Sequence, residues 1–235
     1  CASMINYSIA GWDVSKVTNM AVMFSGCPSF NHRLETWDTV NVTCMDYMFN
    51  GCTQFNEPIG SWNTGKVQRM EHMFKDCTAF NQPINHVQST DKWNTSKVTT
   101  MAGMFEGCSN FNQDINKWNT SEVMDMSNMF KNATSFDKDI DYDSVSSSWD
   151  TLKVENMSGM FSYATSFNQV VNDWNVSKVT DMSGMFSYAT SFNQVVNDWN
   201  VSTVTDMSRM FKNATSFNQD LNNWKNTSEI GRAHV

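Results

Sequence analysis

Basic residues and histidines are scarce in this chain. Its 235 residues include 16 Lys and Arg, 24 Asp and Glu and four His, which gives a net charge of −8. This balance argues against a nucleic-acid-binding protein, which normally carries a basic patch or stripe. No stretch approaches the roughly 18 apolar residues of a transmembrane helix, and the N-terminus shows no targeting signal.

The common signatures of catalysis are missing too. The sequence contains no Gly-rich phosphate loop, no Gly-x-Ser-x-Gly turn and no His-Glu-x-x-His pattern. We therefore expect a protein that is not an enzyme and that uses no cofactor and no metal ion.

What the chain has instead is a periodic set of large aromatic residues. The nine tryptophans are separated by 25, 25, 31, 25, 31, 25, 25 and 25 residues, and the sixteen phenylalanines form two rows with the same spacing. The tryptophans are Trp12, Trp37, Trp62, Trp93, Trp118, Trp149, Trp174, Trp199 and Trp224. A fixed period of about 20 to 50 residues is typical of solenoids and other repeat proteins.

Each repeat predicts one coil of an α/β repeat solenoid. The apolar spacing from Val179 to Ala189 suits a short helix or 3-10 turn with one buried face. Trp199 and Val201 alternate as in a very short strand. The pattern is leucine-rich-repeat-like. It predicts one short parallel strand at Trp-x-Val/Thr plus a short helix or 3-10 turn in each coil of about 25 residues.

We expect residues 1–229 to form a single solenoid of about eight repeats, cut at both ends. Six extra residues fall near 86–91 and again near 142–147, just before the Trp of their repeats. Insertions of this kind become loops on one face, often the binding face. Residues 157–177 recur identically as 182–202. Residues 230–235 match no repeat position and are predicted to be a non-native tail.

Other rows of the repeat are interpreted as core. Sixteen of the eighteen methionines occupy two fixed positions, which favours core packing over a Met-rich binding groove. Cys27, Cys52, Cys77 and Cys108 share one position with alanines of later repeats, which predicts a small buried slot, with disulfides between adjacent coils as the alternative. The Trp row is expected to cap the core, and the alternative is an exposed stacking platform for sugars.

Two polar patterns are given structural interpretations. An Asn or Asp follows the second Phe of every repeat, as in Asn168 and Asn193, and is expected to bond turn backbone. Asp137, Asp139, Asp141 and Asp143 alternate as at the start of a calcium loop, but the turn glycine and distal Glu of such a loop are absent. We expect a solvated acidic loop there.

The run from Trp174 to Phe186, followed by Ser191-Phe-Asn-Gln194, resembles the 26-residue repeat of bacterial surface proteins, the BspA-like family of the leucine-rich-repeat group. The resemblance covers residues 1–229. It implies a solenoid in secreted or surface-anchored microbial proteins, located outside the cell or on its surface, with protein binding or adhesion as the usual suggestion. No anchor is visible in this sequence.

Three hypotheses for function follow. The first is a non-enzymatic module that binds a protein, or a glycan, through the strand face. The candidate binding residues are Asp13, Asp38, Asn63, Asn94, Asn119, Asp150, Asn175 and Asn200 after each Trp, with Lys16, Lys66, Lys97, Lys153 and Lys178 in a second row. The second hypothesis is a passive spacer or stalk, and the third is glycan binding through exposed Trp.

Overall fold

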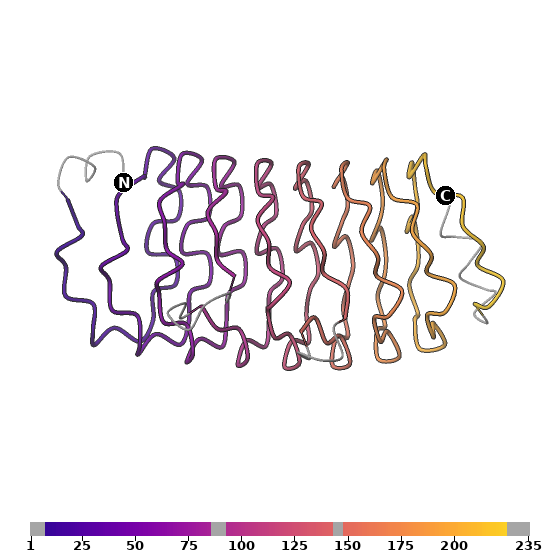
Figure 1. The fold of residues 1–235 in the computed structure, drawn as a ribbon, viewed down its shortest axis with the longest axis horizontal. Coiled ribbons are helices and arrows are strands. Elements are labelled where there is room, and N and C mark those ends of the chain that lie inside the picture. Colours follow the sequence, from indigo (N-terminus) through magenta and orange to yellow (C-terminus); the bar gives the residue numbers. More distant parts are fainter. Residues whose placement is uncertain (1–7, 86–92, 143–147, 225–235) are drawn as a thin grey trace.

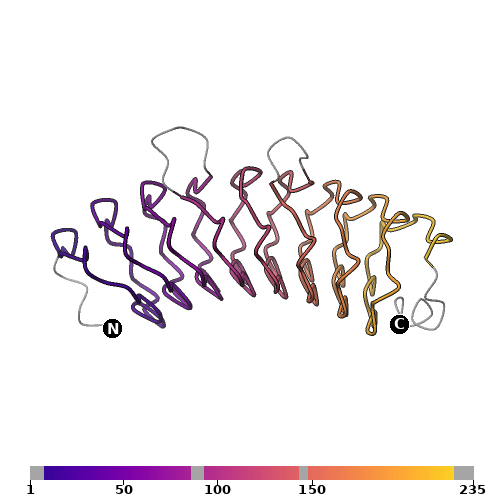
Figure 2. The same cartoon turned by 90° about the horizontal axis from the view of Figure 1, so that it is seen from below.

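The computed structural model describes residues 8–85, 93–142 and 148–224, which form eight stacked coils in an elongated arc (Figures 1 and 2). Successive coils are joined by a ladder of isolated parallel β-bridges. We number the coils 1 to 8 by their bridge residues, which are Asn19, Cys44, Arg69, Thr100, Asp125, Asn156, Asp181 and Asp206. The tail at 230–235, the insertion at 86–91 and most of the insertion at 142–147 lie outside the described residues.

Each coil is built from separate turns, and the described residues contain no helix and no extended strand. In coil 7 the N–H of Met185 donates to the carbonyl of Met182, Ser187 to Gly184 and Ala189 to Phe186, at 3.0 to 3.2 Å. The predicted helix over Val179 to Ala189 is therefore wrong. The i to i+3 bonds of a 3-10 turn are present, but they do not join into a helix.

Left-handed residues explain why the turns do not propagate. The third and the seventh residue after every bridge have positive φ, which makes sixteen such residues in eight coils. The first set is Val22, Tyr47, His72, Gly103, Asn128, Gly159, Gly184 and Arg209, and the second is Gly26, Gly51, Asp76, Gly107, Asn132, Tyr163, Tyr188 and Asn213. A positive φ at the third of the four residues of a turn is typical of a type II turn, and a residue with this φ cannot continue a right-handed helix.

The parallel ladder lies seven residues after each Trp, so the strand predicted at Trp-x-Val/Thr is also wrong. The N–H groups of Met20, Val22, Phe24 and Gly26 donate to carbonyls of coil 2 at 2.7 to 2.9 Å. Around the Trp, in contrast, the backbone closes on itself, because the N–H of Trp37 donates to Leu34 of its own coil. Side chains replace the ladder there: Thr39 Oγ1 donates to the carbonyl of Asn63 in the next coil.

The interior is a set of aromatic columns that run the length of the stack. Rings of the first Phe row repeat every 5.6 to 5.8 Å, and those of the second row every 5.8 to 6.1 Å. Neighbouring Trp rings are 6.3 to 6.5 Å apart. Rings next to the ladder are closer, with 4.8 Å between Tyr47 and His72 and 4.3 Å between Tyr163 and Tyr188. Because the coil spacing grows from ladder to Trp, the coils fan out with the ladder on the concave side of the arc (Figure 2).

The core assignments from the sequence are confirmed for the interior coils. The Phe and Met rows are buried there, and Trp37 to Trp224 are 0 to 3% exposed. Seven indole N–H groups donate to a carbonyl of the preceding coil at 2.9 to 3.1 Å. The core is open at the two ends of the described stack: Trp12 is 45% and Met23 36% exposed, and Phe217 and Leu221 are only partly buried.

Candidate functional site

The repeat separates constant positions from variable ones, and one set of variable positions lies along the ladder. Trp, both Phe, both Met and the Val before each bridge are the same residue in every described coil. The bridge residue and the residues two, three, six and seven positions after it change from coil to coil. We call the surface that they form the seam face. In coil 3 its members are Arg69, Glu71, His72, Lys75 and Asp76.

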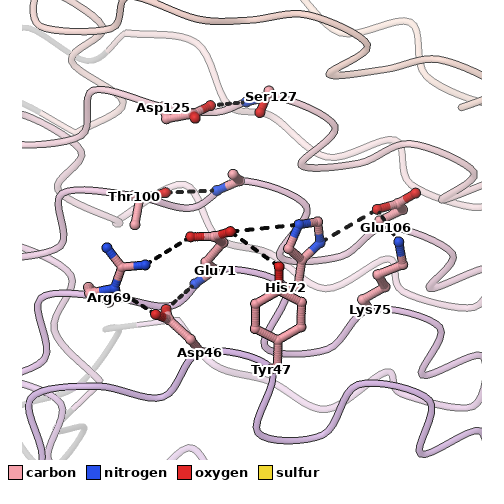
Figure 3. A network of polar contacts seen from close by, with 11 residues as sticks. Asp46, Tyr47, Arg69, Glu71, His72, Lys75, Thr100, Glu106, Asp125 and Ser127 are labelled. Carbon is pink, nitrogen blue, oxygen red and sulfur yellow. Dashed lines mark hydrogen bonds and ion pairs between the residues drawn. The ribbon is translucent and has the colours of Figure 1, made fainter. Parts of the chain in front are cut away.

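Over coils 2 to 4 the seam face carries a network of charged side chains (Figure 3). Arg69 joins Asp46 of coil 2 to Glu71 of its own coil, through Nε to Asp46 Oδ2 at 2.6 Å and Nη2 to Glu71 Oε2 at 2.9 Å. The second oxygen of Asp46 accepts the backbone N–H of Glu71 at 2.8 Å. The hydrogen bond to Asp46 and its charge raise the pKa of Arg69. This carboxylate therefore fixes both the backbone and the cation of the next coil.

The network continues across His72 to coil 4 (Figure 3). Nε2 of His72 lies 4.0 Å from Glu71 Oε1, and Nδ1 lies 3.5 Å from Glu106 Oε2. Glu106 also contacts Nζ of Lys75 at 2.9 Å and Nζ of Lys131 at 3.6 Å. Tyr47 Oη donates to Glu71 at 3.3 Å, and burial followed by the charge of Glu71 raises the pKa of this phenol.

The cations of this network face solvent more than the carboxylates do. The side chain of Arg69 is 51% exposed and that of Lys131 is 36% exposed, against 11% for Asp46 and 13% for Glu106. The buried acids therefore orient the outward cations, which suits contact with a partner surface.

The row of Asn and Asp residues directly after each Trp, which was predicted to bind a partner, has a structural role in the coil. Each of its eight side chains accepts the backbone N–H two residues further on, at 2.9 to 3.3 Å. These residues are Asp13, Asp38, Asn63, Asn94, Asn119, Asp150, Asn175 and Asn200. They flank the Trp column rather than the ladder, so they do not line the strand face as expected. Their role in binding stays a prediction.

Each residue of the predicted Lys row lies three residues before a bridge residue of the ladder. Lys16, Lys66, Lys97, Lys153 and Lys178 are all exposed. Nζ of Lys66 donates to Asn41 Oδ1 at 2.7 Å, and Nζ of Lys153 contacts Glu122 Oε1 at 2.7 Å. Two members of the row are therefore engaged within the chain, and binding by this row also remains a prediction.

The sugar platform proposed for the Trp row is wrong for the interior coils. Their indoles are 0 to 3% exposed, so no ring face is open to a ligand. The acidic run behaves as expected of a structural loop where it is described. Asp137 accepts the N–H of Asn168, and Asp139 accepts that of Asp141. In the described parts of the chain, no three His, Cys, Asp or Glu side chains are placed to hold a metal ion.

Three members of the cysteine row are buried packing residues, whereas Cys27, which is also buried, is disulfide-bonded. Cys52, Cys77 and Cys108 are free thiols that donate to Phe carbonyls of the preceding coil at 2.8 to 3.1 Å, so the three form no disulfides with one another. Burial raises the pKa of Cys52 to about 12 and also raises those of Cys77 and Cys108 well above the ordinary value of a thiol. The Asn or Asp that follows the second Phe of each repeat is also structural. Asn168, for example, accepts the N–H of Asn193 one coil on, at 2.9 Å.

A family match covers almost the whole chain. The family described as "Mycoplasma protein of unknown function, DUF285" matches residues 1–91, 85–148 and 143–234. The chain belongs to the DUF285 family. The overlapping matches agree with a repeated unit, whereas membership of the BspA-like family is not shown. No curated protein matches this DUF285 chain.

Several solved structures show a weak similarity to this DUF285 chain. The Drosophila Toll–Spatzle complex has 13% identity and a TM-score of 0.30 over 86% of this chain and 28% of that chain. The TLR13–ssRNA13 complex has 11% identity and a TM-score of 0.28, over 85% and 31%. An internalin of Listeria monocytogenes has 9% identity and a TM-score of 0.24, over 87% and 66%. The chain thus spans about a third or less of the first two proteins.

Sequence reasoning missed the seam face because it placed the ladder at the Trp. One signal could have located it. The third and seventh positions after each bridge hold Gly, Asn or Asp in ten of sixteen cases, counted from the two sets above. These residues favour left-handed turns.

No described residues form a helix long and apolar enough to cross a bilayer.

Proposed function

We propose that this DUF285 chain is a non-enzymatic protein-binding module of a microbial surface or secreted protein, and that the seam face is its recognition surface. The observation that carries the proposal is the separation of constant from variable positions. The columns of Trp, Phe, Met and Val are the same in each described coil and hold the stack together. The seam face changes residue by residue along a concave surface.

The chemistry of the seam face supports protein binding over catalysis. Its charged network holds Arg69 and Lys75 in fixed positions through carboxylates that are themselves bonded to backbone or to other cations. Preorganised cations of this kind can bind carboxylates or carbonyls with little loss of side-chain entropy. Arginine and tyrosine, which are enriched in binding hot spots, both occur on this face. Adhesion is one use of such a module, and it belongs to the same proposal.

A selection experiment tests the proposal with two matched arginine variants. A phage-displayed peptide library is selected on the immobilised chain, and enriched peptides are then measured against Arg69→Ser and Arg33→Ser. Arg33 is an exposed arginine away from the ladder, with one weak contact to Glu35 at 3.9 Å. We expect enriched peptides that lose binding with Arg69→Ser and keep it with Arg33→Ser.

The alternative, a passive spacer, makes the opposite prediction. A spacer would enrich no common sequence, and neither arginine would affect whatever binds. Equal losses in both variants would show that binding follows total charge rather than the seam face. Either result would remove the proposal, because it depends on recognition at one defined surface.

A further inference from the structure

The seam face changes character after coil 4. In coils 5 to 8, the two left-handed positions and the residue before the second of them contain no Asp and no Glu. They contain three cations, Lys131, Arg209 and Lys212, and the two tyrosines Tyr163 and Tyr188. We call this part of the seam face the tyrosine strip. The acids of the seam face in coils 5 to 8 are the bridge residues Asp125, Asp181 and Asp206, each of which accepts the backbone N–H of the Ser two residues further on.

The two tyrosines occupy a left-handed backbone position that every coil has, although that position does not call for a tyrosine. Their φ angles are 60° and 59°, and the other six coils have Gly, Asn or Asp at this position. A bulky residue with positive φ is uncommon and costs on the order of 1 kcal/mol. Backbone outliers of this kind cluster at functional sites, and these two expose aromatic surface at a strained position.

The geometry leaves the tyrosine pair accessible. The rings stack at 4.3 Å with 6° between their planes, and Tyr163 is 41% exposed. The other left-handed position of the same two coils is Gly159 and Gly184, so these two residues add no side chain beside the rings. Burial, together with the neighbouring Tyr188, raises the pKa of Tyr163, so its hydroxyl stays protonated and able to donate.

The cations at the C-terminal end of the strip are available. Arg209 is exposed, and in residues 148–224 neither Arg209 nor Lys212 forms an ion pair. The contact of Lys212 with coil 7 is a backbone hydrogen bond, in which the N–H of Tyr188 donates to the carbonyl of Lys212 at 2.7 Å. In coils 2 to 4, in contrast, the main cations are already paired with carboxylates.

We infer that the tyrosine strip binds an acidic, extended segment of a partner protein, an inference that rests on the proposed protein-binding function. Carboxylates of the segment contact Arg209 and Lys212, and its apolar groups pack on the Tyr163–Tyr188 pair. Aromatic rings with Gly, Ser, Asn and Arg around them are the composition of evolved protein-binding loops. The cations supply the charge preference, because a carboxylate paired with Arg is held by strong, directional bonds.

The five tyrosines of the chain allow a direct test by fluorine NMR. The chain is labelled with 3-fluorotyrosine, and each signal is assigned with a single Tyr→Phe variant. The probe is a synthetic peptide that repeats Glu, Gly and Leu, and the comparison peptides carry Lys or Ser in place of Glu. We expect the acidic peptide to shift the signals of Tyr163 and Tyr188 while Tyr47 in coil 2 stays unchanged.

Each variant introduces a residue that another coil has at the same repeat position. Arg209→Gly with Lys212→Ser introduces the residues that coils 6 and 7 have at these positions. We expect the affinity for the acidic peptide to fall about tenfold or more. Lys178→Thr is the charge control, because coil 8 has Thr203 at that position, and it should leave the affinity unchanged.

Three outcomes would overturn the inference. They are equal shifts with the serine peptide, an affinity that ignores Arg209 and Lys212, and shifts by a sulfated oligosaccharide without any by the acidic peptide. These results differ from a failure of the proposed function. Selected peptides that depend on Arg69 would keep the seam face as a binding surface even if the tyrosine strip ignored acidic segments.

Discussion

Replacing one buried tryptophan should show whether the aromatic columns hold the coils together. Trp118 lies in the middle of the stack and is 1% exposed. Its ring is 6.0 Å from that of Phe105, and its Nε1 donates to the carbonyl of Ile84 at 2.9 Å. Trp118→Ala removes the ring, opens a cavity and leaves that carbonyl without its donor.

The expected loss follows from the area that the ring buries. An aromatic side chain buries roughly 150–250 Å², which at about 25 cal/mol per Å² is about 4–6 kcal/mol. Measured costs of Trp→Ala in protein cores are about 3–5 kcal/mol. We therefore expect Trp118→Ala to lower the free energy of unfolding by about 3–5 kcal/mol. Trp118→Phe keeps most of the ring, so its cost should approach the 1–3 kcal/mol of an unpaired buried carbonyl.

Trp12 provides the matched control, since it occupies the same repeat position but is 45% exposed. Trp12→Ala gives up only about half of the buried area, and solvent fills the space, so its cost should stay below about 2 kcal/mol. The assay is urea unfolding followed by the fluorescence of the remaining tryptophans. A loss below about 1 kcal/mol for Trp118→Ala, or equal losses at the two positions, would refute the assignment of the Trp column as core.

Three more changes test the left-handed turns and the buried thiols. Val22 is β-branched, 58% exposed and has φ 62°, so Val22→Gly should raise the melting temperature by relieving about 1 kcal/mol of strain. Gly103 and Gly184 have φ 58° and 59°, but a Cβ at Gly103 would overlap the ring of His72, whereas one at Gly184 would make only an ordinary contact with Ser187 Cβ at 3.8 Å. Gly103→Ala should therefore destabilise the chain more than Gly184→Ala in parallel thermal melts, and equal effects would contradict the His72 placement. Burial raises the pKa of Cys52 to about 12 from 9.0, so the stability that this thiol contributes is complete below pH 9 and is lost as the pH rises toward 12. Native chain should resist iodoacetamide at Cys52 at pH 8, with mass spectrometry as the readout, and rapid alkylation there would be the contrary result.

The sequence was sufficient to predict the repeat, the solenoid and the buried columns. Periodicity alone identified Trp118, Phe105 and the cysteine row as interior, because large aromatic residues at one fixed position must bury one another when coils stack. It also predicted that Asn168 and its equivalents bond backbone, which they do across coils. These features depend only on residue type and on register.

The secondary structure within a coil could not be read the same way. Apolar spacing from Val179 to Ala189 is the same for a helix and for a chain of turns that buries the same residues. The difference lies in the backbone of Gly184 and Tyr188, which is left-handed. Tyr188 gives no hint of this from its type. The strand was misplaced for a related reason: Trp199 and Val201 alternate, but the backbone N–H of Trp199 bonds within its own coil.

The left-handed positions also explain how the seam face can vary without loss of the fold. Val22, Tyr47, His72 and Arg209 replace glycine at one such position, and each still forms its hydrogen bonds to the next coil or within its own coil. Each replacement costs on the order of 1 kcal/mol of strain, while one buried Trp contributes several times that amount. A coil can therefore accept a strained side chain on its concave surface because the columns behind it supply the stability. Under the proposed function, recognition and folding are carried by different rows of one repeat, and a change of partner would require changes only at the seam face.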